Sequence, residues 1–290
     1  VYVRDAKSLE EYLERYTITL SVMQTAAALE RIAYEFVVDA ARENIRYVEV
    51  RYCPALHTPA LSLTQAVEAP LSGLKRGEAE TGTWARLIVC GLRTLPPSVS
   101  LDLARLAVDY RAAGVVAFDL AGAERGHPAR DHAKAFEYAL GRGLACTCHA
   151  GEGDGPDSIR QALHVCGAHR IGHGTRLQED PQLEWYVRER GVPLEMCLTS
   201  NVHTGVVRDV AEHPLRRYLD RGCVVTLNTD SRLMDGTTLS DEYWLAHTRL
   251  GLGRPELERL ILNAFHSAFL PDGDKERVIG RVTRELEEIR

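Results

Sequence analysis

The chain alternates between short apolar runs and longer amphipathic stretches. Runs rich in β-branched residues predict seven strands, at 45–52, 85–93, 115–120, 144–150, 170–173, 193–198 and 223–229. Most of these runs are apolar at nearly every position, which is typical of parallel strands that are buried on both faces of a sheet.

Helical patterns fill the intervals between these runs, at 64–81, 98–113, 128–142, 156–167, 180–190 and 214–221. Further helices are predicted before the first strand, from Ser8 to Glu43, and after the last, at about 238–250, 255–269 and 273–289. No G-x-G-x-x-G follows any strand, so seven strand–helix units favour an α/β fold of the (β/α)8 TIM-barrel type over an open doubly wound sheet.

The count of strands is one short of a closed barrel. The helical sequence near the N-terminus looks like the material that follows a first strand, and the first residue is Val rather than Met. We therefore predict that residues 1–290 form one barrel domain with extra helices, incomplete at its N-terminus because the first strand is missing.

Composition narrows the class of protein. The 290 residues are 45% hydrophobic, which suits one large globular domain, and they carry 35 basic and 41 acidic residues without a basic block. This charge pattern argues against nucleic acid or an anionic membrane as a partner. The seven cysteines lie mostly in apolar runs, which indicates buried thiols, and no run is long enough to span a bilayer. We expect a cytoplasmic protein that acts on a small molecule.

Polar residues follow the ends of several predicted strands, where the active site of a parallel barrel is built. His149 and Glu152 follow the fourth strand, His173 ends the fifth, and Asp230 with Ser231 follows the last. Imidazole and carboxylate groups are ligands of catalytic zinc, which makes hydroxide available at neutral pH. Glu152 lies close enough to act as a general acid or base without binding the metal. These residues predict a metal-dependent hydrolase.

Several of these positions have a simpler interpretation. Taken alone, His149 could be a core histidine with backbone partners, but its combination with the other strand-end residues favours a ligand. Asp119, which ends the third strand, could equally cap the loop that follows. Glu124, in the same loop, is interpreted as solvated.

Cysteine and the remaining histidines are weaker candidates. Cys146 and Cys148 alternate along one strand, which favours thiols of the barrel wall over a metal site. Among the other histidines, His203 is the strongest candidate because it follows a strand end. The rest are interpreted as surface or supporting residues.

Five ordered motifs carry a family resemblance. They are FDLAGAE (118–124), HAGEG (149–153), RIGHGTRL (170–177), CLTSNV (197–202) and LNTDSRL (227–233). With them the chain resembles the adenosine deaminases of the amidohydrolase superfamily, from VMQT near the start to NAFHSAF near the end. The resemblance implies a (β/α)8 enzyme with one Zn²⁺ that removes the 6-amino group of adenosine or deoxyadenosine, giving inosine or deoxyinosine and ammonia in purine salvage.

The resemblance also implies a role for each matching residue. His149 and Asp230 would bind zinc, Glu152 would protonate purine N1, and His173 would act on the attacking hydroxide. Gly122 would contact purine N3 through its backbone.

Two departures from the family pattern leave alternatives open. Ser231 stands where the family usually has a second Asp that bonds purine N7; a hydroxyl can still donate that bond, but it lacks the charge. Adenine and 6-aminodeoxyfutalosine therefore remain alternative substrates.

The family's first strand also ends in a His-x-His pair of zinc ligands, which these 290 residues lack. We expect that pair upstream of Val1; without it, the alternative is an inactive purine-binding protein.

Overall fold

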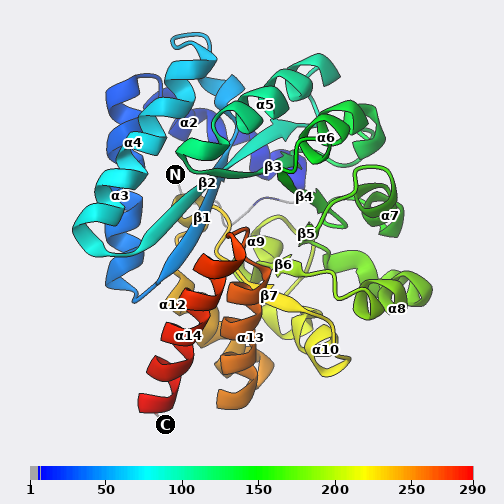
Figure 1. Cartoon of the computed structure of the whole chain (residues 1–290). Helices are drawn as coiled ribbons and strands as arrows, with labels where there is room; N and C mark the ends of the chain where they lie inside the picture. The colour runs from blue at the N-terminus through cyan, green and yellow to red at the C-terminus, as the bar shows by residue number, and fades with distance from the viewer. Residues whose placement is uncertain (1–5, 7, 290) are drawn as a thin grey trace.

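Seven parallel strands lie side by side in sequence order and curl into most of a TIM-type barrel (Figure 1). The computed structural model describes residue 6 and residues 8–289. The strands are β1 (Tyr47–Tyr52), β2 (Trp84–Leu92), β3 (Val115–Ala121), β4 (Ala145–Ala150), β5 (Arg170–His173), β6 (Leu194–Met196) and β7 (Val225–Leu227). Sequential parallel neighbours are the order that right-handed strand–helix–strand crossovers produce. The predicted α/β barrel is confirmed, with seven strands in the described part of the chain.

Helices surround the strands (Figure 1). Before β1 come α1 (Leu9–Glu14), α2 (Tyr16–Ser21) and α3 (Ala26–Arg42). Between the strands lie α4 (Leu63–Thr81), α5 (Pro97–Asp109), α6 (Ala133–Leu140), α7 (Pro156–His164), α8 (Pro181–Glu189), α9 (Leu198–His203) and α10 (Leu215–Asp220). After β7 come α11 (Arg232–Asp235), α12 (Leu239–Leu250), α13 (Arg254–Ser267) and α14 (Asp272–Glu288).

Several element boundaries differ from the predicted ones, and two of these differences bear on the strand ends. The stretch from Ser8 to Glu43 forms three helices, and Arg15 separates α1 from α2. The strand predicted over 193–198 keeps only three residues, since the chain enters α9 at Leu198. Both differences bring additional side chains to the same end of the barrel.

Ion pairs cross the interior between strands. Arg51 of β1 contacts Asp119 of β3 at 3.1 Å and Glu195 of β6 at 2.5 Å. Arg170 of β5 contacts Glu195 and Glu49 of β1, each at 2.6 Å. Burial acts to raise the pKa of Glu195, but the charges of Arg51 and Arg170 outweigh it and lower that pKa to about 2. Glu195 therefore stays ionised at neutral pH, and the network links four strands.

The apolar core lies between the strands and the helices, and the cysteines belong to it. All seven cysteines are free and buried, and Cys146 and Cys148 have no exposed surface, as predicted for barrel-wall thiols. In the described part of the chain, no helix is both long enough and apolar enough to cross a membrane.

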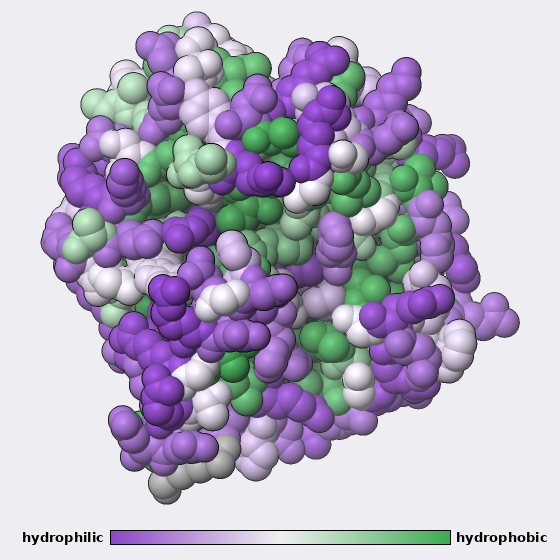
Figure 2. Space-filling model, viewed as in Figure 1, coloured by the Kyte–Doolittle hydropathy of each residue, from purple (hydrophilic) through white to green (hydrophobic). Residues whose placement is uncertain are grey.

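Strands β1 and β7 are the two edges of the sheet, and a cavity of about 340 Å³ lies between them. Val50 of β1 and Leu227 of β7 line it, and it extends to His149 and Asp230. Figure 2 shows apolar residues gathered in the hollow at the centre of the molecule, with hydrophilic residues around it. An unpaired strand edge exposes a row of N–H and C=O groups. The gap between β1 and β7 is therefore open to a further strand.

Candidate active site

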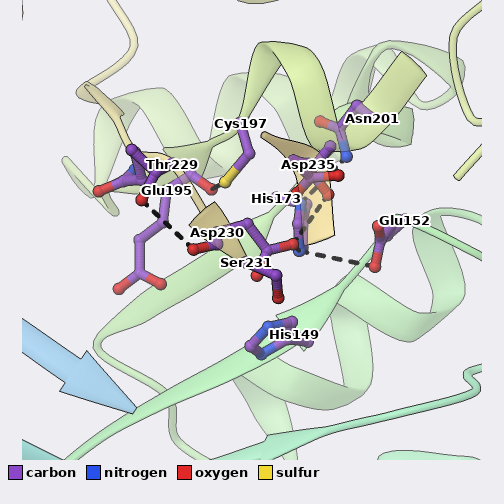
Figure 3. Close-up of polar contacts among 12 residues, drawn as sticks. His149, Glu152, His173, Glu195, Cys197, Asn201, Thr229, Asp230, Ser231 and Asp235 are labelled. Carbon is purple, nitrogen blue, oxygen red and sulfur yellow. Dashed lines mark hydrogen bonds and ion pairs between the residues drawn. The ribbon is translucent and has the colours of Figure 1, made fainter. Parts of the chain in front are cut away.

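The strand ends bring the predicted catalytic residues together (Figure 3). The rings of His149, on β4, and His173, at the end of β5, have centroids 5.1 Å apart. Nε2 of His173 lies 3.5 Å from Glu152 Oε2 and 4.0 Å from Asp230 Oδ2. Gly122 follows β3 at the neighbouring strand end, with a positive φ of 95°. Four polar side chains that are up to 81 residues apart in sequence thus share one site.

Strained backbone marks two of these positions. Among the described residues other than glycine, positive φ occurs only at Asn44, His173 and Asp230, with 63° and 54° at the latter two. This region is unfavourable for side chains with a Cβ, so the surrounding structure must hold both residues there. Gly172 adds a close approach, because a Cβ at this position would lie 3.1 Å from Cα and Cγ of His149. The sequence Gly172–His173 therefore lets the two histidines approach each other.

Glu124 organises the loop that carries Glu152. Its carboxylate accepts hydrogen bonds from the backbone N–H groups of Gly151 (3.1 Å), Glu152 (3.0 Å) and Asp154 (3.3 Å). Its side chain is 2% exposed, so the prediction that Glu124 is solvated is wrong. A buried carboxylate with three backbone donors fixes this loop.

Glu152 is placed to act as a proton donor. Burial, followed by the charges of Asp230 and Glu124, raises the pKa of Glu152 to about 8. The carboxyl group therefore keeps its proton at neutral pH. A general acid needs a pKa near the working pH, and Glu152 meets that condition.

Asp119 orients His149. Its carboxylate lies 3.0 Å from Nδ1 of His149 and 3.1 Å from Arg51, and the side chain has no exposed surface. Burial acts to raise the pKa of Asp119, but the charges of His149 and Arg51 hold it well below its usual range. The side-chain partners of Asp119 are thus His149 and Arg51, and because Nδ1 of His149 is engaged, Nε2 is the ring nitrogen that remains for a ligand. The sequence analysis did not identify Arg51 as a partner of Asp119. The available signal was a charged residue within a predicted strand.

Two residues of α9 orient the other site groups. Ser200 Oγ donates to Asp230 Oδ2 at 2.8 Å, and Asn201 Nδ2 lies 3.1 Å from Nδ1 of His173. Both α9 residues are fully buried. The signal for Ser200 and Asn201 in the sequence was a polar segment after a predicted strand. Their role depended on where α9 packs, which the sequence did not show.

The N-terminal helices reach the site through Ser231. Its hydroxyl is hydrogen-bonded to the phenol of Tyr16, and Tyr12 packs edge-on against the Tyr16 ring with centroids 5.9 Å apart. His203 Nδ1 lies 2.9 Å from Asp235 Oδ1, in α11 just after Ser231, which gives it a partner outside the catalytic group. Sequence reasoning did not identify Tyr16, whose contact with Ser231 spans 215 residues.

The described residues supply part of a metal site. His149 and Asp230 carry donor atoms that zinc accepts, but the described part of the chain contains no group of three or more His, Cys, Asp or Glu side chains placed to hold a metal ion. Zinc sites in proteins have four ligands, of which a catalytic site takes about three from the protein. The donor chemistry fits zinc, and the number of donors is too small without further ligands.

Comparisons with known sequences identify relatives. The family model described as adenosine deaminase matches residues 1–285. An adenosine deaminase of Mycobacteroides abscessus is 40% identical over 297 residues, covering 97% of this chain and 82% of that protein. A probable adenosine deaminase of Dictyostelium discoideum is 40% identical over 267 residues, covering 92% of this chain. The chain spans only 35% of the length of the Dictyostelium protein.

Solved structures share the fold. The adenine deaminase of Arthrobacter aurescens superimposes with a TM-score of 0.93 at 27% identity, covering 98% of this chain and 87% of that chain. An amidohydrolase of Burkholderia ambifaria with bound Zn has a TM-score of 0.86 at 24% identity, covering 91% and 74% of the two chains. With the family model matching nearly its whole length, the chain belongs to the adenosine deaminase family of the amidohydrolase superfamily.

Proposed function

We propose that this chain is the main part of a zinc-dependent hydrolase that converts adenosine or deoxyadenosine to the inosine product and ammonia, in purine salvage. The observation that carries the proposal is the convergence of His149, Glu152, His173 and Asp230, with left-handed backbone at the last two. The relatives at 40% identity, which are described as adenosine deaminases, support the same reaction.

The residues divide the chemistry between them. Glu152 holds a proton at neutral pH and delivers it to N1 of the purine ring, which makes C6 more electrophilic. His173 lies between Glu152 and Asp230 and contacts the nucleophile, while the backbone of Gly122 bonds N3 and the hydroxyl of Ser231 bonds N7. As the C6–O double bond forms, the proton of the added hydroxyl passes to the amino group, the C6–N bond breaks and ammonia leaves.

Zinc belongs to this proposal as the cofactor, one per subunit, with His149 and Asp230 as two of its ligands. When bound, it would lower the pKa of water so that a nucleophile is available near neutral pH. The missing ligands require another segment, and the gap between β1 and β7 is the place for it. We propose that a strand from outside these 290 residues fills this gap, completes the barrel and ends in the two remaining histidine ligands.

The cysteines and the net charge support a compartment and a class of substrate. Seven free, buried cysteines support a reducing compartment, for which we propose the cytoplasm. The partner we propose is a small purine nucleoside, because the chain carries a net charge of −6 and its sequence has no block of basic residues suited to nucleic acid.

Adenine is the second candidate substrate. The neutral Ser231, held by Tyr16, changes the polar surface beside Asp230, and the adenine deaminase of Arthrobacter superimposes closely. 6-Aminodeoxyfutalosine is the third candidate substrate, on the departure at Ser231.

The deciding experiment follows the ultraviolet change from adenosine to inosine in the intact gene product, with adenine and 6-aminodeoxyfutalosine in parallel. We expect adenosine to be preferred, zinc to be present, and Glu152→Gln to lower kcat/KM by about 10²- to 10⁴-fold, the range for losing a general acid. Purine binding without turnover, in a protein whose reading frame has no upstream His-x-His, would identify a binding protein instead.

A further inference from the structure

A chain of hydrogen bonds runs from the start of α10 to His173. The backbone N–H of Leu215 donates to Nδ1 of His213 at 3.2 Å. Nε2 of His213 lies 3.0 Å from Oδ1 of Asn201, and Nδ2 of Asn201 lies 3.1 Å from Nδ1 of His173. Thr175 also donates its hydroxyl to Oδ1 of Asn201 at 3.0 Å.

The backbone N–H of Leu215 determines the direction of every hydrogen bond in this series. A backbone N–H can only donate, so Nδ1 of His213 must accept and its proton must reside on Nε2. That proton goes to Oδ1 of Asn201, which orients the amide so that its NH₂ group faces His173. Nδ1 of His173 must therefore accept, and the proton of the neutral His173 ring resides on Nε2.

The chain is shielded from water, which keeps its directions unique. The three side chains between Leu215 and the site are 3% (His213), 0% (Asn201) and 2% (His173) exposed. Burial lowers the pKa of His213 to about 3, so His213 stays neutral and has one proton to donate. In a dry interior, reversing one bond would leave two donors or two acceptors facing each other.

We propose that His213 and Asn201 are positioning residues that hold His173 in the tautomer with the proton on Nε2. His173 then presents a hydrogen-bond donor to the space between Glu152 and Asp230, where its Nε2 lies 3.5 Å and 4.0 Å from their carboxylates. The catalytic meaning rests on the proposed function: a donor stabilises negative charge that develops on the attacking oxygen, and a neutral ring with this proton in place does not accept one from it.

The tautomer can be read directly, without turnover. Long-range ¹H–¹⁵N correlation spectra of protein with ¹⁵N-labelled histidine distinguish a protonated from an unprotonated ring nitrogen, and the His173 signals are assigned by their absence in His173→Asn. We expect Nε2 of His173 to be protonated and Nδ1 to be unprotonated. In His213→Phe, Oδ1 of Asn201 keeps only the Thr175 hydroxyl, which can rotate and does not by itself fix the amide, so we expect a mixture of the two tautomers.

Kinetics and a conservative variant separate positioning from simple loss of structure. We expect His213→Phe to lower kcat by about 10-fold or more, with KM changed by less than about threefold, because the lost donor acts on the transition state. His213→Gln keeps an N–H donor for Asn201 and should restore both the tautomer and most of kcat. The matched control is His57→Gln, since His57 is equally buried and bonds the carbonyl of Met23 instead.

Two results would overturn the inference. One is a His173 ring that carries its proton on Nδ1 in the unaltered protein. The other is a His173 tautomer that stays unchanged in a folded His213→Phe variant, as judged by its melting temperature. A protein that deaminates no purine would instead contradict the proposed function, and the spectra would still report on the tautomer.

Discussion

Replacing Glu152 with glutamine should lower activity and raise stability, with a dependence on pH that the structure specifies. The pKa of Glu152 is about 8 in the folded chain, against an ordinary value of 4.5. Because the folded state keeps a proton that the unfolded chain releases, folding carries a cost that is absent below about pH 4.5. The cost grows as pH rises towards 8 and is constant above that value.

The size of this cost follows from the two pKa values. Each unit corresponds to about 1.36 kcal/mol, and pH 7 lies about 2.5 units above the ordinary pKa, so the free energy of unfolding is reduced by about 3 kcal/mol at pH 7. Glutamine has nearly the same shape and does not ionise. Glu152→Gln should therefore gain up to about 3 kcal/mol over the unaltered protein at pH 7 and nothing at pH 4.5.

Equilibrium urea unfolding at a series of pH values between 4.5 and 8.5 measures this difference. Glu35→Gln serves as the control, because Glu35 is half exposed on α3 and pairs with Arg31 at the surface. A stability difference between Glu152→Gln and the unaltered protein that stays constant across this range would contradict a raised pKa of Glu152.

Three further outcomes test other parts of the site. Glu124→Gln should shift the alkaline limb of the kcat/KM profile to lower pH, because the charge of Glu124 contributes to the raised pKa of Glu152. Asp119→Asn should weaken zinc binding by about 10- to 100-fold in chelator competition, since it loses the carboxylate that orients His149; unchanged affinity would contradict this role. Tyr16→Phe should lower kcat/KM for adenosine more than for 7-deazaadenosine, which lacks the acceptor for Ser231; equal losses would argue against it.

Much of the fold was readable because barrel strands have a local signature. Each of the seven strands is apolar at most positions and is followed by an amphipathic helix, so its identity depends on short windows of sequence. Strand β5 was predicted although it has only four residues, because His173 and the glycines beside it mark its end. The C-terminal boundary of β6 was not predicted. The strand stops early because tertiary packing turns the chain into α9 at Leu198.

The site residues could also be identified from local sequence, but the residues that contact them could not. His149, Glu152, His173 and Asp230 stand at strand ends that a parallel barrel must bring to one face, so their grouping followed from topology. Glu124 illustrates the opposite case, because a glutamate in a polar loop looks solvated until the fold closes over it.

The sequence by itself determined the barrel, the strand-end residues and the class of chemistry, because periodicity and motif spacing act over a few residues at a time. Only the tertiary structure decided protonation and orientation. The raised pKa of Glu152, the contact of Asp119 with His149 and the hydrogen bonds from Leu215 to His173 join residues that lie 28 to 78 positions apart. Burial and charge at such contacts depend on distances that local sequence does not encode.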